Sequence, residues 1–160
     1  MDSLSSLLIP FRNPAPGPRL PEGYQFESDG ELPLEALNHL LTVCGETQRS
    51  QERWHRVLAC SAWHLAIRDP NDRLVGFIRA TSDQALNANL WDLLTDPADP
   101  GRDPVITALV QMALARLRRE LSGCSISLSA PPEALQALKQ VGFVVDPGGI
   151  RAMGLRLESN

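Results

Sequence analysis

The hydrophobic positions of the chain first follow a helical period. In PLEALNHLLTVCG (33–45), apolar residues recur three and four positions apart, a proline stands in the first turn and a glycine follows the last turn. This pattern predicts a helix, and Ser50 as N-cap predicts a second one over SQERWHRVLACS (50–61). Before them, YQFESD (24–29) alternates between polar and apolar residues and predicts a short strand.

Residues 63–96 change to a strand pattern. Two runs rich in strand-forming residues, WHLAIRD (63–69) and LVGFIRATSD (74–83), flank a turn of Pro, Asn and Asp, as in a β-hairpin. A third run, LNANLWDLLTD (86–96), has a similar length. Together these runs predict an antiparallel meander, in which Gly76 marks a bulge or a point of close approach.

The second half of the chain alternates helix and strand. PVITALVQMALARLRREL (104–121) predicts the strongest helix, with Asp103 as N-cap, a proline at its first position and arginines near its end. The elements after it are a strand over 125–130, a helix over 131–142 and a closing strand over 149–158. The order β-α-α-β-β-β-α-β-α-β predicts an α+β fold, with a mixed, mostly antiparallel central sheet flanked by helices.

A proline-rich stretch, PFRNPAPGPRLPEG (10–23), precedes these elements and excludes helix and ladder strand. We therefore divide the 160 residues into a proline-rich N-terminal arm over 1–23 and one domain over 24–160. A domain of this length can bury a core without disulfides or metals. An extended proline-rich arm is available for recognition by a protein partner.

Composition narrows the classes of function. The formal net charge of −4 argues against nucleic acid as a primary partner, because such binding needs a basic surface. The three cysteines are scattered and do not indicate a disulfide framework. No apolar run approaches the roughly 20 residues that span a bilayer, and the three histidines lack metal-ligand spacing. We therefore expect a cytoplasmic protein with no metal, no membrane partner and no nucleic-acid partner.

Three segments of the sequence resemble the cyanobacterial and plastid branch of the GNAT acyltransferases. VGFIRATSD (75–83) is similar to the branch's VGFARATSD, and NANLWDLLTDP (87–97) is similar to NATIWDVVVHP. APPEALQALKQVGFVVDPGGIRAM (130–153) aligns without a gap with ADPQVVGFYEKLGFEADPEGIKGM. The resemblance implies a GNAT fold for about 24–157, and transfer of an acetyl group from acetyl-CoA to an amine of a small molecule or a protein.

The resemblance also implies where acetyl-CoA binds. The fourth strand should splay from its neighbour over 90–95 and offer backbone groups to the pantetheine arm of acetyl-CoA. The residues that take this role by position are Leu93, Leu94 and Thr95. Because main-chain groups do the binding, the side chains at these positions need not match those of the family.

The phosphate end departs from the family pattern. GNAT proteins hold the pyrophosphate on a glycine-containing loop and the next helix N-terminus, but here Asp103 and Pro104 stand in that region. An Asp cap would compete with phosphate for the N–H groups, and Pro removes a donor. Gly101 and Arg102 remain to hold a phosphate, Arg102 as a forked donor. We therefore expect weaker binding of acetyl-CoA than in a glycine-loop relative.

The catalytic groups leave two functions open. The tyrosine that protonates the thiolate in the family falls on Leu138, which has no proton to give. Asp92 on the fourth strand is placed to accept a proton from an ammonium substrate, or is simply a polar residue on the solvent side of the strand. The chain is then either an acetyltransferase with a degraded cofactor loop, or an inactive GNAT-fold module that binds a protein partner.

Overall fold

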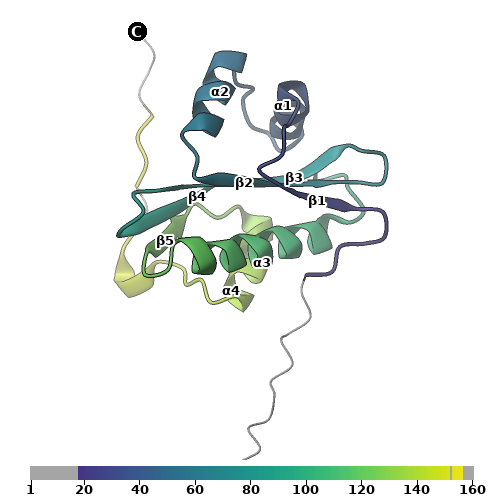
Figure 1. Ribbon diagram of the computed structural model, residues 1–160. Coiled ribbons are helices and arrows are strands. Elements are labelled where there is room, and N and C mark those ends of the chain that lie inside the picture. The colour runs from purple at the N-terminus through teal and green to yellow at the C-terminus, as the bar shows by residue number, and fades with distance from the viewer. Residues whose placement is uncertain (1–17, 152, 157–160) are drawn as a thin grey trace, which may run out of the picture.

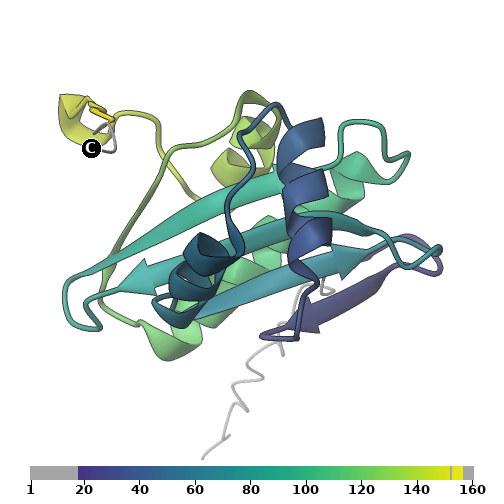
Figure 2. The same cartoon turned by 90° about the horizontal axis from the view of Figure 1, so that it is seen from above.

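The computed structural model describes residues 18–151 and 153–156, which form a five-stranded sheet between two layers of helices (Figures 1 and 2). The strands cross the sheet in their sequence order. The first four are antiparallel to one another, and the fifth is parallel to the fourth. They are β1 (Gln25–Ser28), β2 (Trp63–Arg68), β3 (Leu74–Ser82), β4 (Asn87–Thr95) and β5 (Ser125–Leu128).

The helices cover both faces of this sheet. On one face lie α1 (Leu34–Val43) and α2 (Gln51–Ala59), and on the other lie α3 (Arg102–Glu120) and α4 (Leu135–Gln140) (Figure 1). The predicted α+β class and the mostly antiparallel sheet are confirmed. Of the predicted arm, residues 1–17 lie outside the described part of the chain, and 18–23 contain neither helix nor strand.

Each layer of helices buries its own apolar cluster against the sheet. Under α1 and α2, Trp54 and Phe77 are fully buried and meet edge to face, with ring centroids 6.2 Å apart. Under α3, Val105 and Leu109 are fully buried. A Cβ added at Gly76 would lie 2.7 Å from Cγ1 of Val105, so α3 can pack this closely only on a glycine. The close approach predicted at Gly76 is therefore confirmed.

The N-terminus of α3 differs from the prediction. The helix begins at Arg102 with Gly101 as N-cap, so that Asp103 and Pro104 lie inside the first turn. A proline is tolerated there because the first N–H groups of a helix have no partner within the helix. The cap predicted for α2 is correct, since the side chain of Ser50 accepts a hydrogen bond from the backbone N–H of Arg53 at 3.2 Å.

The predicted closing strand over 149–158 is wrong for the residues that the structure describes. None of 149–151 or 153–156 belongs to a strand, and Ile150, Met153 and Leu155 are 72%, 97% and 88% exposed. A turn with positive φ at Gly148 and Gly149 precedes this segment, which then runs away from the sheet (Figure 1). Alternation alone does not make a strand, because strand formation depends on packing against a neighbour.

Candidate functional site

β4 and β5 are paired over only part of β4. Residues 87–90 lie beside 125–128, but β4 continues to Thr95 while the chain after β5 turns toward α4. The two segments diverge there, as the resemblance implies. The space between them is a cavity of about 420 Å³, with β4 on one side and residues 129–133 on the other.

A β-bulge lies in β4 where this cavity begins. The register between β3 and β4 shifts between Phe77 and Arg79, so that Asp92 and Leu93 stand opposite the single residue Ile78. Asp92 has a φ of 52°, in the left-handed region. A bulge leaves the extra residue outside the ladder. The backbone at this point of β4 can therefore offer hydrogen bonds to a ligand in the cavity.

The carboxylate of Asp92 is held by two arginines. Arg49 donates from both terminal nitrogens, at 2.6 and 3.0 Å, and Nε of Arg79 donates at 2.5 Å. Burial by itself would raise the pKa of Asp92, but the hydrogen bonds from the two guanidinium groups outweigh it and lower that pKa. Asp92 is thus an anion and only a weak base. Its side chain is 11% exposed, so it is not the solvent-facing residue of the alternative interpretation.

Cys44, at the end of α1, lies in the same cavity as the β4 backbone. Its thiol donates a hydrogen bond to the carbonyl oxygen of Thr95 at 3.3 Å. Burial raises the pKa of the Cys44 thiol, which therefore stays protonated and remains a donor. No local motif in the sequence indicates this contact, because the two residues are joined only by the packing of α1 on the sheet.

The loop before α3 is held by its own carboxylates. The side chain of Asp96 accepts from the N–H of Ala98 at 2.9 Å, and the side chain of Asp99 accepts from the N–H of Gly101 at 3.0 Å. The backbone carbonyl of Asp99 accepts from the N–H of Arg102 at 3.1 Å. Several N–H groups that a glycine loop would turn toward phosphate are therefore already bonded.

Gly101 has a packing role in this loop. A Cβ at this position would lie 2.6 Å from Oη of Tyr24. That hydroxyl donates to the carboxylate of Asp99, with both oxygens at 3.0 Å. Burial and the neighbouring Asp99 raise the pKa of Tyr24, so the phenol keeps its proton. Gly101, the single glycine of the loop, thus leaves space for the side chain of Tyr24, which directly precedes β1.

Arg102, at the start of α3, bonds to Glu133, which lines the cavity. Its Nη2 donates to Oε1 of Glu133 at 2.8 Å, and its Nε donates to Oγ1 of Thr95 at 3.3 Å. Glu133 belongs to a short 3₁₀ helix before α4, Pro132–Ala134. The cation expected to hold a phosphate is therefore already paired with an anion, in a bridge whose side chains are 28% and 32% exposed.

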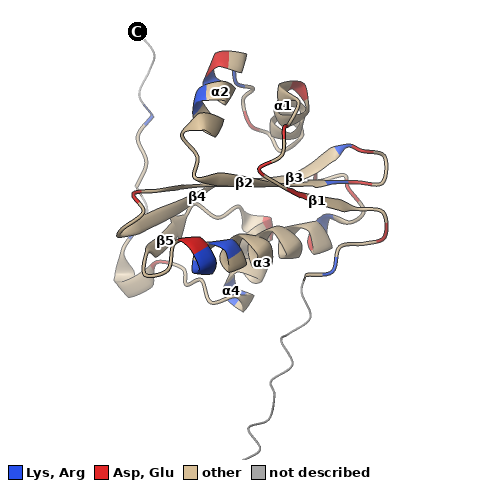
Figure 3. Cartoon of the chain, in the orientation of Figure 1, with Lys and Arg blue, Asp and Glu red and all other residues tan. Residues whose placement is uncertain are grey.

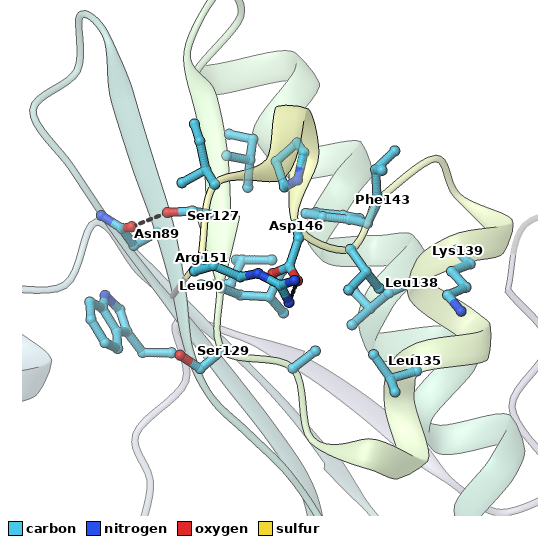
Figure 4. Close-up of a pocket in the computed structure, with 18 residues that line it drawn as sticks. Asn89, Leu90, Ser127, Ser129, Leu135, Leu138, Lys139, Phe143, Asp146 and Arg151 are labelled. Carbon is cyan, nitrogen blue, oxygen red and sulfur yellow. Dashed lines mark hydrogen bonds and ion pairs between the residues drawn. The ribbon is translucent and has the colours of Figure 1, made fainter. Parts of the chain in front are cut away.

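Leu138 on α4 is buried and borders a second cavity of about 650 Å³ between β5, α4 and residues 143–151 (Figure 4). Four of the polar residues there form pairs: Asn89 bonds with Ser127, and Asp146 bonds with Arg151 at 2.8 Å. The side chain of Leu138 is a hydrocarbon and has no ionisable proton, so it cannot act as a general acid.

The described residues contain no group of three or more His, Cys, Asp or Glu side chains that could hold a metal ion. Within the same part of the chain, no helix is long and apolar enough to cross a membrane.

Several curated proteins are similar to this chain, although no family model matches it. It is 36% identical over 129 residues to the uncharacterised N-acetyltransferase ycf52 of Pyropia yezoensis, covering 79% of this chain and 73% of the relative. The ycf52 protein of Porphyra purpurea is 35% identical over 123 residues, with 75% and 70% covered. The chloroplastic GCN5-related N-acetyltransferase 2 of Arabidopsis thaliana is 37% identical over 81 residues, with 51% and 31% covered.

Solved structures share the fold at lower identity. A GNAT family acetyltransferase of Streptococcus pneumoniae matches with a TM-score of 0.64 and 18% identity, covering 86% of this chain and 99% of that one. The GNAT family N-acetyltransferase YhbS of Escherichia coli, solved in complex with CoA, matches with a TM-score of 0.59 and 17% identity. This second match covers 81% of this chain and 72% of YhbS.

Proposed function

Since this chain belongs to the GNAT family of N-acetyltransferases, we propose that it transfers an acetyl group from acetyl-CoA to an amine of a small molecule or a protein. The observation that carries the proposal is the divergence of β4 from β5 at a bulge. It opens a cavity lined by Leu93 and Leu94, and Thr95 follows them at the end of β4. These are the groups that would hold the pantetheine arm. Acetyl-CoA would supply the activated acyl group.

In the proposed reaction the acetyl group passes directly to the amine, and no covalent bond to the protein forms. The amine nitrogen forms a bond to the acetyl carbon, the carbon–sulfur bond breaks, and the amine gives up a proton. Asp92 is the acidic side chain at the bulge and would accept that proton through a water molecule. It is a weak base, because two arginines favour its anionic form. Leu138 gives no proton to the departing thiolate. We propose that the missing general acid slows the reaction by roughly 10²–10⁴-fold.

We further propose that the phosphates of acetyl-CoA are held weakly. Several N–H groups of the loop are bonded to Asp96 and Asp99, Pro104 has no N–H, and Arg102 is paired with Glu133. A phosphate would have to displace Glu133 before it could use the forked donor of Arg102. The cytoplasmic location also stays a prediction, since three relatives are named chloroplastic.

A second candidate is a GNAT-fold module without catalysis. The paired Arg102 and the buried Leu138 favour it, because both lie where a working enzyme would use a free cation and an acid. Such a module would bind a protein partner, and the arm over 1–23 is the segment of suitable composition.

Isothermal titration with acetyl-CoA and with its phosphate-free acetyl-pantetheine analogue tests both candidates. If the protein is an acetyltransferase, acetyl-CoA binds at micromolar to submillimolar concentration, and added amines release CoA thiol. The absence of heat with either ligand up to millimolar concentration would overturn the enzyme proposal. The module proposal would then be tested by capture of a partner with and without residues 1–23.

A further inference from the structure

Four arginines surround a hollow of about 490 Å³ on the α2 side of the sheet. Arg49 precedes α2, Arg53 and Arg56 lie three positions apart on α2, and Arg79 comes from β3. The basic positions of α2 are drawn blue in Figure 3. Val57 adds an apolar side chain to the lining of the hollow. Residues far apart in the chain thus bring four positive charges to one place.

These charges are only partly balanced within the described part of the chain. Arg49 and Arg79 share the single carboxylate of Asp92. Arg56 pairs with Glu52, but both side chains are more than three-quarters exposed, at 77% and 84%, and such a pair contributes little. Arg53 forms no ion pair there. Four guanidinium groups therefore face two carboxylates, in a protein whose net charge is −4.

The two arginines next to Asp92 are held in fixed orientations. The guanidinium of Arg49 lies 4.6 Å from the centroid of the Trp54 ring, and that of Arg79 lies 5.8 Å from the centroid of the Trp91 ring. Arg79 also donates to the hydroxyl of Ser61 at 3.4 Å. Donors that are oriented before a ligand arrives lose less entropy when they bind it.

The hollow and the cavity of about 420 Å³ beside β4 meet at Asp92. This residue lines the cavity together with Leu93, while its carboxylate bonds to two of the arginines that line the hollow. An amine attacking an acyl group at the bulge would approach past Asp92. The remainder of the acceptor molecule would then lie over the hollow.

We infer that the arginine-lined hollow binds an anionic group, a carboxylate or a phosphate, on the acceptor, and that the preferred acceptors are amines bearing such a group. The inference rests on the acetyl-transfer activity proposed above. Forked guanidinium donors match the oxygens of both anions. The apolar side chain of Val57 in the lining can contact the carbon chain between the amine and the anion. A local positive field also attracts an acidic acceptor to the site.

The test compares acceptors that differ only in the anionic group. With acetyl-CoA present, we expect kcat/KM to be at least about tenfold higher for 4-aminobutyrate and 6-aminohexanoate than for butylamine and hexylamine. 3-Aminopropyl phosphate, set against propylamine, distinguishes phosphate from carboxylate as the favoured anion. Equal rates for the charged and neutral acceptors would overturn the inference while leaving the acetyltransferase proposal standing.

Two variants locate the effect. Arg53→Gln should remove most of the preference by raising KM for 4-aminobutyrate about tenfold, with little change for butylamine. Arg118→Gln is the matched control, because Arg118 is exposed on α3 on the opposite face of the sheet. Loss of the preference in both variants alike would contradict a site in the hollow.

A binding measurement without acetyl-CoA separates the two proposals. Tryptophan fluorescence should report 4-aminobutyrate binding, because Trp54 and Trp91 lie against Arg49 and Arg79. Binding that Arg53→Gln weakens about tenfold would support the anion site even if no acetyl transfer is found. If 4-aminobutyrate binds no better than butylamine, the inference is wrong, whatever the outcome with acetyl-CoA.

Discussion

At the scale of single residues, Arg102 is the cation that we propose to meet the phosphates of acetyl-CoA. Its bridge to Glu133 is partly exposed and is therefore weak, so a phosphate can compete for the guanidinium. We expect Glu133→Gln to raise the affinity for acetyl-CoA about two- to fivefold, which corresponds to about 0.5–1 kcal/mol. Calorimetric titration checks this result.

The phosphate-free analogue is the control for that experiment. Its affinity should be the same in the original chain and in Glu133→Gln, since it offers no anion to Arg102. A similar gain with both ligands would mean that Glu133 restricts the cavity sterically, without competing for the cation.

Gly101 gives a second prediction at this scale. The Cβ of an alanine there would lie 2.6 Å from Oη of Tyr24, so the ring or the loop must shift. We expect Gly101→Ala to lower the free energy of unfolding by about 1–3 kcal/mol, measured in urea. In a Tyr24→Ala background most of this loss should vanish, and a fully additive double variant would contradict the steric explanation.

At the scale of elements, the first turn of α3 has few N–H groups free for the proposed phosphate contact. Pro104 has no N–H, and the N–H of Arg102 is bonded to the carbonyl of Asp99. Pro104→Ala restores one donor at a helix N-terminus, where a hydrogen bond to a charged group is worth about 1.5–3 kcal/mol. We expect an affinity for acetyl-CoA about tenfold higher by calorimetry, and no change for the phosphate-free analogue.

The same substitution should cost little stability. Alanine makes the unfolded chain more flexible than proline does, so the free energy of unfolding should fall by no more than about 1 kcal/mol. An unchanged affinity for acetyl-CoA in a well-folded Pro104→Ala protein would show that this helix turn is not what limits phosphate binding.

Element boundaries show how far local patterns reach. Ser50 was predicted as the cap of α2 from its side chain alone, and the structure confirms it. Asp103 was chosen as the cap of α3 for the same reason, yet the helix starts earlier, at Arg102. Tyr24, which is distant in sequence, packs against the Gly101 cap. The local pattern around Asp103 contains no sign of this contact.

At the scale of the whole molecule, buried carboxylates paired with arginines make stability depend on pH. Burial raises the pKa of Asp69 and Asp92, but hydrogen bonds outweigh it and lower both values in the folded protein. Their stabilising contribution is then present above the unfolded value of about 3.9 and is lost as pH falls through the folded values. We expect the free energy of unfolding to be steady near neutral pH and to fall below about pH 4.

Urea unfolding at a series of pH values measures this dependence. Asp69→Asn should reduce the slope below about pH 4, because it removes a carboxylate that accepts hydrogen bonds from the backbone and side chain of Arg73. Glu35→Gln, on the exposed side of α1, is the matched control and should leave the slope unchanged. A slope that is the same in both variants would show that Asp69 is not part of the pH dependence.

Local chemistry along the chain was enough to predict several elements. The change from a helical to a strand period placed the two early helices and the meander, Gly76 marked the close approach of α3, and three matching segments indicated the GNAT family. The sequence also indicated that Leu138 has no proton to give. Each of these inferences depends on residue type and spacing along a short stretch of chain.

Which side chains meet at the site depends on how the elements pack together. The tertiary structure joined Asp92 to Arg49 and Arg79, placed Cys44 beside Thr95, and left 153–156 away from the sheet. The two partners in two of these contacts, Arg49 with Asp92 and Cys44 with Thr95, are separated by more than forty positions. Such contacts depend on how the elements pack, and no pattern within one element can encode them.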